Sequence, residues 1–306
     1  MSAVGSLRAR VLVAVGVFCV AGAERAMAQD NGLKVYISAD MEGVVGAVTG
    51  EQLGPDGFEY QRFREFMTEE VLAAIEAARE AGATEILVSD SHGNGQNLLI
   101  DRFPSDVQVV RSWPRPLMMM QGIDSTFDAA ILLGYHAGTT NPEGVRAHTM
   151  SSARLTDIRL NGQSIPEAGM SAAIAGHFGV PVVMISGDDA AVEEAQHVIG
   201  DIEGAIVKWS YGFHSARTLT PAAGYALIRE KVKAALARVD DFAPVRIPSP
   251  VTLEVSFKSY RPVQILAYLP IVELVDAHTI RYVAEDAPAA SAFLEFLLSY
   301  NSELQP

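Results

Sequence analysis

The chain has 306 residues, a formal net charge of −14 and one cysteine, Cys19. Such an acidic chain is poorly suited to nucleic acid or an anionic membrane, so we predict neither as a partner, and its charge favours solubility. After the first 28 residues, no segment of the sequence is long and apolar enough to span a bilayer, and we expect no stable membrane association once those residues are removed.

The first 28 residues have the features of a secretory signal peptide. Arg8 and Arg10 precede an apolar run over residues 11–23, and Ala26-Met27-Ala28 forms a small-x-small cleavage pattern. The run is too short for a transmembrane helix, and a retained membrane anchor is the alternative. We therefore predict an exported protein, periplasmic or secreted. Because Cys19 lies in this leader, any metal bound by the mature chain must be held by His, Asp and Glu.

Apolar runs alternate with helical patterns over residues 29–210. The first run ends at Asp40-Met41-Glu42-Gly43, where Gly43 would let the backbone turn tightly. Continuous apolar strands that alternate with helices are typical of an α/β fold with a mainly parallel sheet, covered by helices on both faces. Strands are expected at residues 34–39, 85–89, 129–134 and 181–186, with a weaker one at 107–111, helices at 60–81, 166–177 and 190–199, and a hairpin over 157–165 that turns at Asn161-Gly162.

The pattern changes beyond residue 210. We predict a metal-binding catalytic α/β domain over residues 29–210 and a smaller C-terminal α/β lobe over residues 211–306. In this second part apolar and polar residues alternate along the predicted strands, as is typical of antiparallel pairing with one face in water. The expected elements are helices at residues 221–239 and 288–300, a proline-rich linker at 242–250, and strands at 251–257, 263–269 and 279–283.

Polar side chains that could bind a metal follow three of the predicted strands. The candidates are Asp40 and Glu42 after the first strand, His92 after the second, His136 after the third, and His148 and Glu167 further along the chain. Successive strands of a parallel sheet end at one edge, so these side chains can converge. Imidazoles and carboxylates without thiols suit zinc, and also manganese or iron. Even five ligands exceed the needs of one tetrahedral zinc, whereas two metal ions about 3.5–4 Å apart that share one carboxylate would use them.

Each candidate also has an ordinary structural explanation. Asp40 and Glu42 could form a solvated turn, and His92 could cap a helix. His136 could be a hydrogen-bonded core histidine, and Glu167 could complement a helix dipole. Taken jointly, two histidines and two acids at strand ends favour the metal site. The remaining histidines do not fit this pattern and are predicted to be structural or exposed: His177, His197, His214 and His278.

Several of these segments resemble the DppA-type D-aminopeptidases in their order and approximate spacing. The resemblance is strong over residues 34–208 and weak beyond them. The matching blocks are Ser38-Ala39-Asp40-Met41-Glu42-Gly43, Ser89-Asp90-Ser91-His92, Leu133-Gly134-Tyr135-His136-Ala137, residues 144–150 with His148, Glu167, and Gly187-Asp188-Asp189.

The resemblance implies a dinuclear zinc exopeptidase that assembles into a large ring-like homo-oligomer, with a decamer as the candidate size. Asp40 would bridge the two metal ions, and the shells would be completed by Glu42, His92, His136 and Glu167. His148 would be the catalytic residue, described in the family as a nucleophile. We expect His148 instead to transfer a proton or stabilise an oxyanion, because metal-activated water is already a good nucleophile.

Three functions are consistent with the sequence. The leading hypothesis is an exported zinc aminopeptidase that hydrolyses the N-terminal residue of short peptides, D-amino-acid peptides among them, by means of water activated by two zinc ions. One alternative is a binuclear hydrolase of another ester or amide, such as a phosphoesterase, although no glycine-rich phosphate cradle accompanies the strand ends. The other is a non-enzymatic periplasmic metal- or peptide-binding protein, which would not require His148.

Overall fold

The computed structural model describes Met1 and residues 32–300 of the chain. Residues 2–28 of the predicted signal peptide lie outside the described residues. The described residues 32–300 belong to one compact unit. Across the described residues, no helix has both the length and the apolar character needed to cross a bilayer.

The larger sheet has seven strands in the order β3-β2-β1-β4-β7-β8-β9. All neighbouring pairs are parallel except β8 and β9. The predicted α/β fold with a mainly parallel sheet is therefore confirmed. The strands are β1 (Leu33–Ala39), β2 (Ala83–Asp90), β3 (Gln108–Val110), β4 (Ala129–Tyr135), β7 (Val182–Asp188), β8 (Glu203–Gly212) and β9 (Ser215–Thr218).

A second sheet has five antiparallel strands in the order β11-β12-β10-β5-β6. Along β10 every second residue is buried, which confirms the predicted alternation. The hairpin between β5 and β6 turns at Asn161 and Gly162, both with positive φ, as a two-residue hairpin turn requires. The strands are β5 (Leu155–Leu160), β6 (Gln163–Ser164), β10 (Val251–Phe257), β11 (Val272–Leu274) and β12 (Thr279–Ala284).

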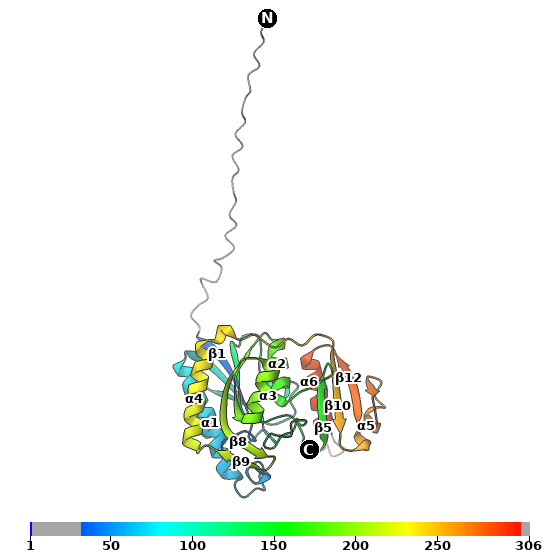
Figure 1. Ribbon diagram of the computed structural model, residues 1–306, viewed down its shortest axis with the longest axis horizontal. Coiled ribbons are helices and arrows are strands. Elements are labelled where there is room, and N and C mark those ends of the chain that lie inside the picture. Colours follow the sequence, from blue (N-terminus) through cyan, green and yellow to red (C-terminus); the bar gives the residue numbers. More distant parts are fainter. Residues whose placement is uncertain (2–31, 301–306) are drawn as a thin grey trace. The chain divides into compact units, whose positions relative to one another are not determined.

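Helices pack on both faces of the larger sheet (Figure 1). The helices are α1 (Tyr60–Glu80), α2 (Glu167–His177), α3 (Asp189–Ile199), α4 (Pro221–Ala237), α5 (Tyr260–Leu266) and α6 (Ala287–Ser299), with short 3₁₀ helices η1 (Gly50–Gln52), η2 (Ile100–Arg102), η3 (Met118–Met120) and η4 (Val239–Asp241). α1 and α4 lie side by side on the face where Val35 and Ile37 of β1 point. α2 and α3 contribute to the opposite core, which includes Tyr36 and extends to the second sheet.

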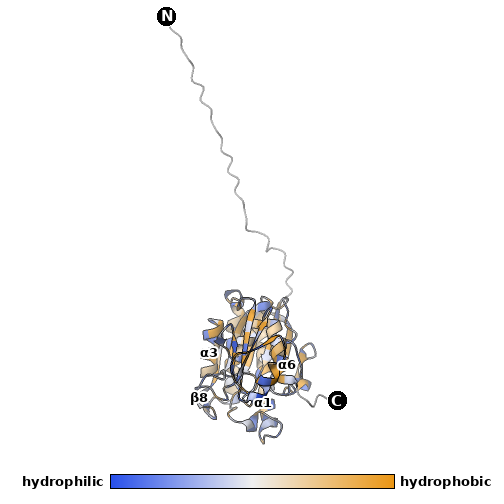
Figure 2. Cartoon of the chain, turned by 90° about the vertical axis from the view of Figure 1, so that its right-hand side faces the viewer, coloured by the Kyte–Doolittle hydropathy of each residue, from blue (hydrophilic) through white to orange (hydrophobic). Residues whose placement is uncertain are grey.

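The cores are built from the continuous apolar runs that predicted the strands. In β1, β4 and β7 almost every residue is buried, because each strand is covered on both faces. Figure 2 shows hydrophobic residues concentrated along the strands and α6, with hydrophilic residues toward the peripheral loops. This double burial holds the carboxyl ends of β1 and β4 in fixed positions at one edge of the sheet, beside the buried last three residues of β2.

One predicted strand is wrong. Residues 263–269 were expected to be extended, but α5 runs through Tyr260–Leu266. Pro262 lies in the first turn of this helix, where backbone N–H groups have no acceptor within the helix. The missing N–H of proline therefore costs no hydrogen bond there. Val263 is the one buried residue of the helix, so the apolar run does not have the two-residue burial period of a strand.

The predicted division of the chain at residue 210 stays a prediction, and the two sheets do not follow it. β8 crosses this position and pairs with β9, and α4 packs against β8, so residues up to 237 belong with the larger sheet. In the other direction, β5 from the first part pairs with β10 from the second.

Candidate metal centre

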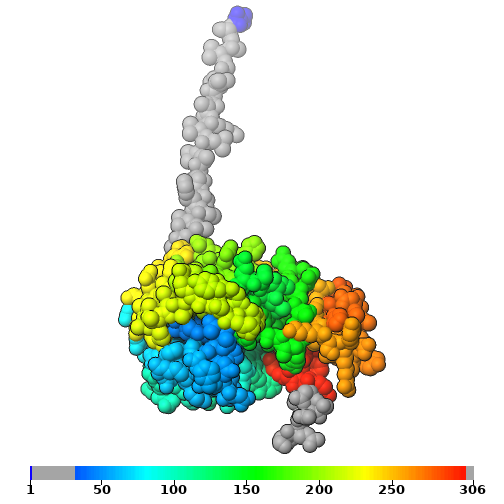
Figure 3. Space-filling view, turned by 60° about the horizontal axis from the view of Figure 1, so that its bottom comes forward, coloured from blue at the N-terminus to red at the C-terminus, as the bar shows by residue number. Residues whose placement is uncertain are grey.

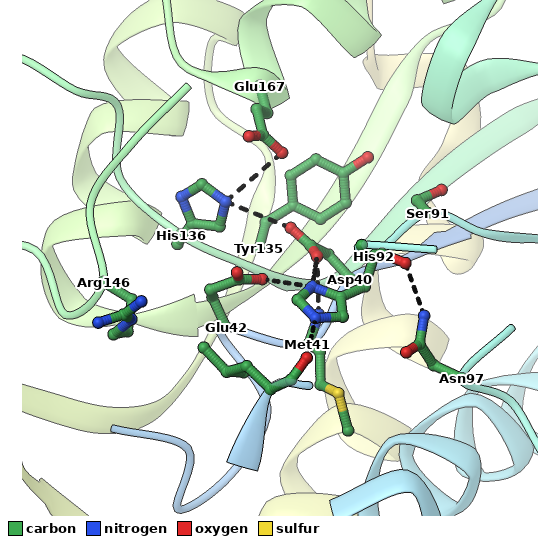
Figure 4. A network of polar contacts seen from close by, with 12 residues as sticks. Asp40, Met41, Glu42, Ser91, His92, Asn97, Tyr135, His136, Arg146 and Glu167 are labelled. Atoms are coloured by element: carbon green, nitrogen blue, oxygen red, sulfur yellow. Dashed lines mark hydrogen bonds and ion pairs between the residues drawn. The ribbon is translucent and has the colours of Figure 1, made fainter. Parts of the chain in front are cut away.

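The predicted ligands do come together at the carboxyl edge of the larger sheet (Figure 4). Asp40 follows β1 directly, His92 stands two residues after β2, and His136 follows β4. Because β1 lies between β2 and β4, these three ends are neighbours. Glu167 is the first residue of α2. Glu42 completes the set from the loop after β1.

The loop after β1 is held against the end of β4 by its backbone. Asp40 N–H donates to Leu133 O (2.8 Å), and Gly43 N–H donates to Gly134 O (2.6 Å). A Cβ atom at Gly43 would lie 2.0 Å from Tyr135 O, a distance that no side chain could tolerate. Gly43 was expected to permit a tight turn, but close approach of two backbones is the reason that the structure gives.

A buried lysine lies beneath this loop. The Lys208 ammonium, from β8, donates to the carbonyl oxygens of Glu42, Val44 (3.2 Å) and Ala47 (2.6 Å). Its side chain is fully buried, and burial lowers its pKa to about 8. Three acceptors use all three hydrogens of an ammonium group. Lys208 therefore fixes the backbone that carries Glu42.

Two groups of possible ligands share Asp40. Asp40 Oδ1 lies 3.1 Å from His92 Nδ1, which also lies 2.8 Å from Glu42 Oε2. Asp40 Oδ2 lies 3.4 Å from His136 Nε2, which also lies 3.4 Å from Glu167 Oε2. The two oxygens of Asp40 thus face different histidines, one on each side of the carboxylate, as Figure 4 shows.

Each histidine has one ring nitrogen occupied by a backbone carbonyl. His92 Nε2 lies 2.7 Å from Leu53 O, and His136 Nδ1 lies 3.0 Å from Ala137 O. A carbonyl only accepts, so these nitrogens carry the hydrogens. The opposite nitrogens, which face the carboxylates, are then the lone-pair sites of the neutral rings. Orientation of a histidine ligand by a bond to its other nitrogen is typical of protein metal sites.

The cluster is buried, and two of its polar atoms lack a hydrogen-bond partner among the described residues. All five side chains are less than one-tenth exposed. Asp40 Oδ2 and His136 Nε2 have no hydrogen-bond partner among the described residues. Burial, with Glu42 nearby, raises the pKa of Asp40. Burial disfavours protonation of His92, but the Glu42 and Asp40 carboxylates outweigh it and raise the pKa of this histidine. The site therefore favours positive charge, which divalent cations would supply.

His148 lies beside this cluster and is more exposed than its members. Its ring stacks on the His136 ring, with centroids 4.1 Å apart and planes 6° from parallel. His148 Nδ1 donates to Arg146 O (2.8 Å), so Nε2 faces the acids, 3.7 Å from Glu167 Oε1 and 4.0 Å from Glu42 Oε1. The same distances place His148 with Glu42 and His136 in a third possible ligand group.

The segment that carries His148 is anchored at three points. His148 N–H donates to Ala137 O (3.0 Å), Arg146 N–H donates to Phe213 O (3.0 Å), and Val145 N–H donates to Asp188 Oδ2 (2.9 Å). Asp188 belongs to the Gly187-Asp188-Asp189 block and also caps α3 through Ala191 N–H. This block therefore supports the site without joining the metal ligands.

Sequence reasoning missed several supporting residues. Asn97 Nδ2 donates to His92 O (2.6 Å) and to Asp90 Oδ1 (2.8 Å), which holds the loop after β2. Glu70 accepts from Val45 N–H (2.8 Å), and burial raises its pKa to about 7. A lysine inside the apolar run of β8 was the one available signal for Lys208. The four histidines set aside earlier lie outside the ligand groups of the described residues: His177, His197, His214 and His278.

The cluster opens into a cavity of about 270 Å³. Beyond the expected ligands, the residues that line this cavity include His148, Met150, Trp113, Met119 and Leu298 of α6. Small pockets beside a polar cluster are typical of small-molecule sites, and drug-sized ligands use about 300–1,000 Å³. This cavity therefore suits a ligand smaller than that class.

Comparison with known proteins gives consistent matches. Residues 33–296 match the family model described as D-aminopeptidase. A D-aminopeptidase of Bacillus subtilis (strain 168) is 32% identical over 255 residues, which cover 83% of this chain and 92% of that protein. A solved structure, described as the Zn-dependent D-aminopeptidase DppA from Bacillus subtilis, a self-compartmentalizing protease, has a TM-score of 0.83 at 31% identity and covers 89% of this chain and 100% of its own. The chain thus belongs to the D-aminopeptidase family.

Proposed function

We propose that this protein is an exported zinc-dependent aminopeptidase that removes the N-terminal residue from short peptides, D-amino-acid peptides among them. One observation carries the proposal. Three histidines and three carboxylates from separate segments meet at one small cavity, and each histidine turns a lone-pair nitrogen toward the carboxylates. Membership of the D-aminopeptidase family supports peptide bonds as the target.

The cluster fits two zinc ions. Asp40 would be shared between them, because its two oxygens face different histidines. Glu42 and His92 would complete one side, and His136 and Glu167 the other. The unpartnered atoms Asp40 Oδ2 and His136 Nε2 are donors of the kind that zinc requires. When bound, zinc supplies Lewis acidity that polarises a carbonyl and lowers the pKa of water.

His148 would act as the general base and then the general acid of the reaction. Its Nδ1–H is engaged by Arg146 O, so Nε2 is the nitrogen free to accept a proton and return it to the leaving amine. This nitrogen lies 3.7 Å from Glu167 Oε1 and 4.0 Å from Glu42 Oε1, so it points toward the expected metal ligands. The stacked His136 ring fixes the plane of the His148 ring and hence the direction of Nε2.

The test is metal analysis of the purified protein, followed by turnover of D-Ala-D-Ala, an L-dipeptide and an aryl phosphate. We expect about two zinc ions per chain and hydrolysis of at least one dipeptide. His92→Ala should lower both the zinc content and the turnover, because it removes one expected ligand. His197→Ala is the matched control, since this exposed histidine on α3 lies outside the cluster, and it should change neither.

Three outcomes would contradict the proposal. Trace metal in active protein would exclude the zinc mechanism. Turnover of the aryl phosphate alone would favour a phosphoesterase, and metal binding without turnover of any substrate would favour a binding protein. The stereochemistry of the preferred dipeptide follows from the same panel.

We further propose that the chain forms a homo-oligomer, with a decamer as the candidate size. Large apolar side chains are exposed along α5 and β11, a surface suited to burial against another copy: Tyr260, Ile265, Tyr268, Ile271 and Leu274. The solved relative is described as self-compartmentalizing. Light scattering after size exclusion should give a mass several times that of one chain. Tyr268→Lys should lower this mass, and a monomeric wild-type protein would contradict the proposal.

Export is proposed from the sequence of the first 28 residues, in which Arg8 and Arg10 precede an apolar run and a small-x-small pattern. N-terminal sequencing of the protein recovered outside the cytoplasm should begin near Gln29. An intact N-terminus on cytoplasmic protein would contradict export and leave the proposed chemistry unaffected.

A further inference from the structure

The cavity beside the metal centre contains two charged residues that are not among the expected ligands or His148. Arg154 and Glu295 line it together with apolar side chains. Arg154 lies just before β5, and Glu295 lies on α6. Arg154 is thus the one lysine or arginine that lines the cavity in the described part of the chain.

The Arg154 guanidinium is held in place and only partly used. Its Nη1 donates to Leu298 O at the end of α6 (3.0 Å), and its Nε makes a long contact with Ser151 Oγ (3.5 Å). Its backbone is fixed, because Arg154 O accepts from Lys258 N–H (2.8 Å). A guanidinium has five N–H donors, so three remain available among the described residues.

No carboxylate pairs with Arg154 in the described part of the structure. Glu295, the other charged wall residue, accepts a hydrogen bond from Ser299 Oγ instead of forming an ion pair with Arg154. Figure 3 shows green atoms from the middle of the chain bordering red atoms near the end of the described chain. The hydrogen bond from Arg154 to Leu298 O joins these two parts of the chain. A guanidinium with no carboxylate partner among the described residues, on the wall of a cavity of about 270 Å³, is available to a small anionic ligand.

We propose that Arg154 binds the free α-carboxylate of the substrate and thereby selects di- and tripeptides over longer chains and peptide amides. The inference rests on the proposed peptidase function. A carboxylate matches the planar donors of a guanidinium, and such charge-assisted bonds are stronger than neutral ones. In the proposed function the scissile bond would lie beside the metal ligands, so the carboxylate of a dipeptide would lie away from them. Two extended residues span at most about 7 Å, which suits so small a cavity.

Kinetics with a matched pair of substrates tests this assignment. The substrates are D-Ala-D-Ala and D-Ala-D-Ala amide, or the L forms if these are preferred, which differ only in the charge at the C-terminus. The wild-type enzyme should show the lower KM for the free acid. Arg154→Gln should raise the KM for the acid about tenfold to a hundredfold, and the ratio of the two KM values should approach one. Arg154→Lys, which keeps the charge, should restore part of the preference.

If Arg154 has a purely structural role, its substitution should change the KM values for the acid and the amide by the same factor, and that result would overturn the proposal. Equal KM values for acid and amide in the wild type would overturn it as well. Arg154 is exposed, and a thermal melt checks that its variants remain folded. If the wild type hydrolyses no peptide, the proposed function fails on its own. Calorimetry of D-Ala-D-Ala and its amide against the zinc-loaded protein then tests carboxylate binding: equal affinities would overturn the assignment, and tighter binding of the acid that is lost in Arg154→Gln would support it.

Discussion

Replacing His148 with alanine should lower peptidase turnover by about a hundredfold to ten-thousandfold, which is the usual contribution of a positioned general acid or base. All three clustered histidines line the cavity, and His148 has the most exposed side chain of the three. Its Nε2 lies 3.7 Å from Glu167 Oε1 and 4.0 Å from Glu42 Oε1. A group in this position can exchange a proton with a substrate, whereas His92 and His136 are buried among carboxylates.

The zinc content of His148→Ala separates two roles for this residue. If His148 acts on the proton alone, the variant should keep the zinc content of the wild type and lose mainly kcat. If it is a ligand, as its distances to Glu42 and His136 would also permit, the zinc content should fall with the activity. His214→Ala is the matched control, because His214 is exposed and lies outside the cluster. Wild-type turnover in His148→Ala would exclude both roles.

The ligand cluster was predictable from the sequence because its signals are local. Asp40, His92 and His136 each follow a continuous apolar run, and a parallel sheet brings such positions to one edge. Glu167 could be found because Pro166 and the helix pattern mark the start of α2. The assignment of these residues as ligands stays a prediction, although the structure brings all of them within reach of one another.

The supporting residues were not predictable, because their partners are distant in sequence. Lys208 meets carbonyls more than 160 residues earlier in the chain. Arg154 reaches the cavity only because α6, at the other end of the protein, packs beside it. The hairpin from β8 to β9 was missed for a different reason. β8 is buried only in part and contains the charged residues Glu203 and Lys208, so it lacks the continuous apolar run of the other strands.

The sequence also could not predict which strands form the second sheet. β5 and β6 come from the middle of the chain, yet they extend a sheet whose other strands follow residue 250. A change in the apolar–polar pattern near residue 210 indicated a boundary. Strand pairing depends on which sheet edges remain unpaired, and the pattern does not show this. α5 was mistaken for a strand because a seven-residue apolar segment fits either period.

Lys208→Met should have the largest effect on stability, with an expected loss of about 3–5 kcal/mol in the free energy of unfolding, as for a buried charge pair that loses one partner. The variant leaves the carbonyls of Glu42, Val44 and Ala47 without their donor in a buried position. It also removes the cation beside two buried acids, Glu70 and Asp188.

The same substitution should weaken zinc binding, although Lys208 itself would touch no metal. The carbonyls that it binds belong to the loop after Asp40, so loss of the ammonium releases the backbone that positions Asp40 and Glu42. Removal of residues that orient metal ligands typically costs about tenfold to a hundredfold in affinity. Urea unfolding in EDTA measures the first effect, and titration of the metal-free protein with zinc measures the second.

Lys233→Met provides the control for Lys208→Met. Lys233 lies on α4 and forms an exposed ion pair with Glu80 of α1 (2.8 Å). Exposed pairs contribute little to stability, so this variant should unfold and bind zinc nearly as the wild type does. If Lys208→Met unfolds like the control but binds zinc weakly, the ammonium acts only on the loop. If it loses stability and keeps full zinc affinity, the Asp40 loop is positioned by its bonds to Leu133 and Gly134 alone, and Lys208 has no part in shaping the site.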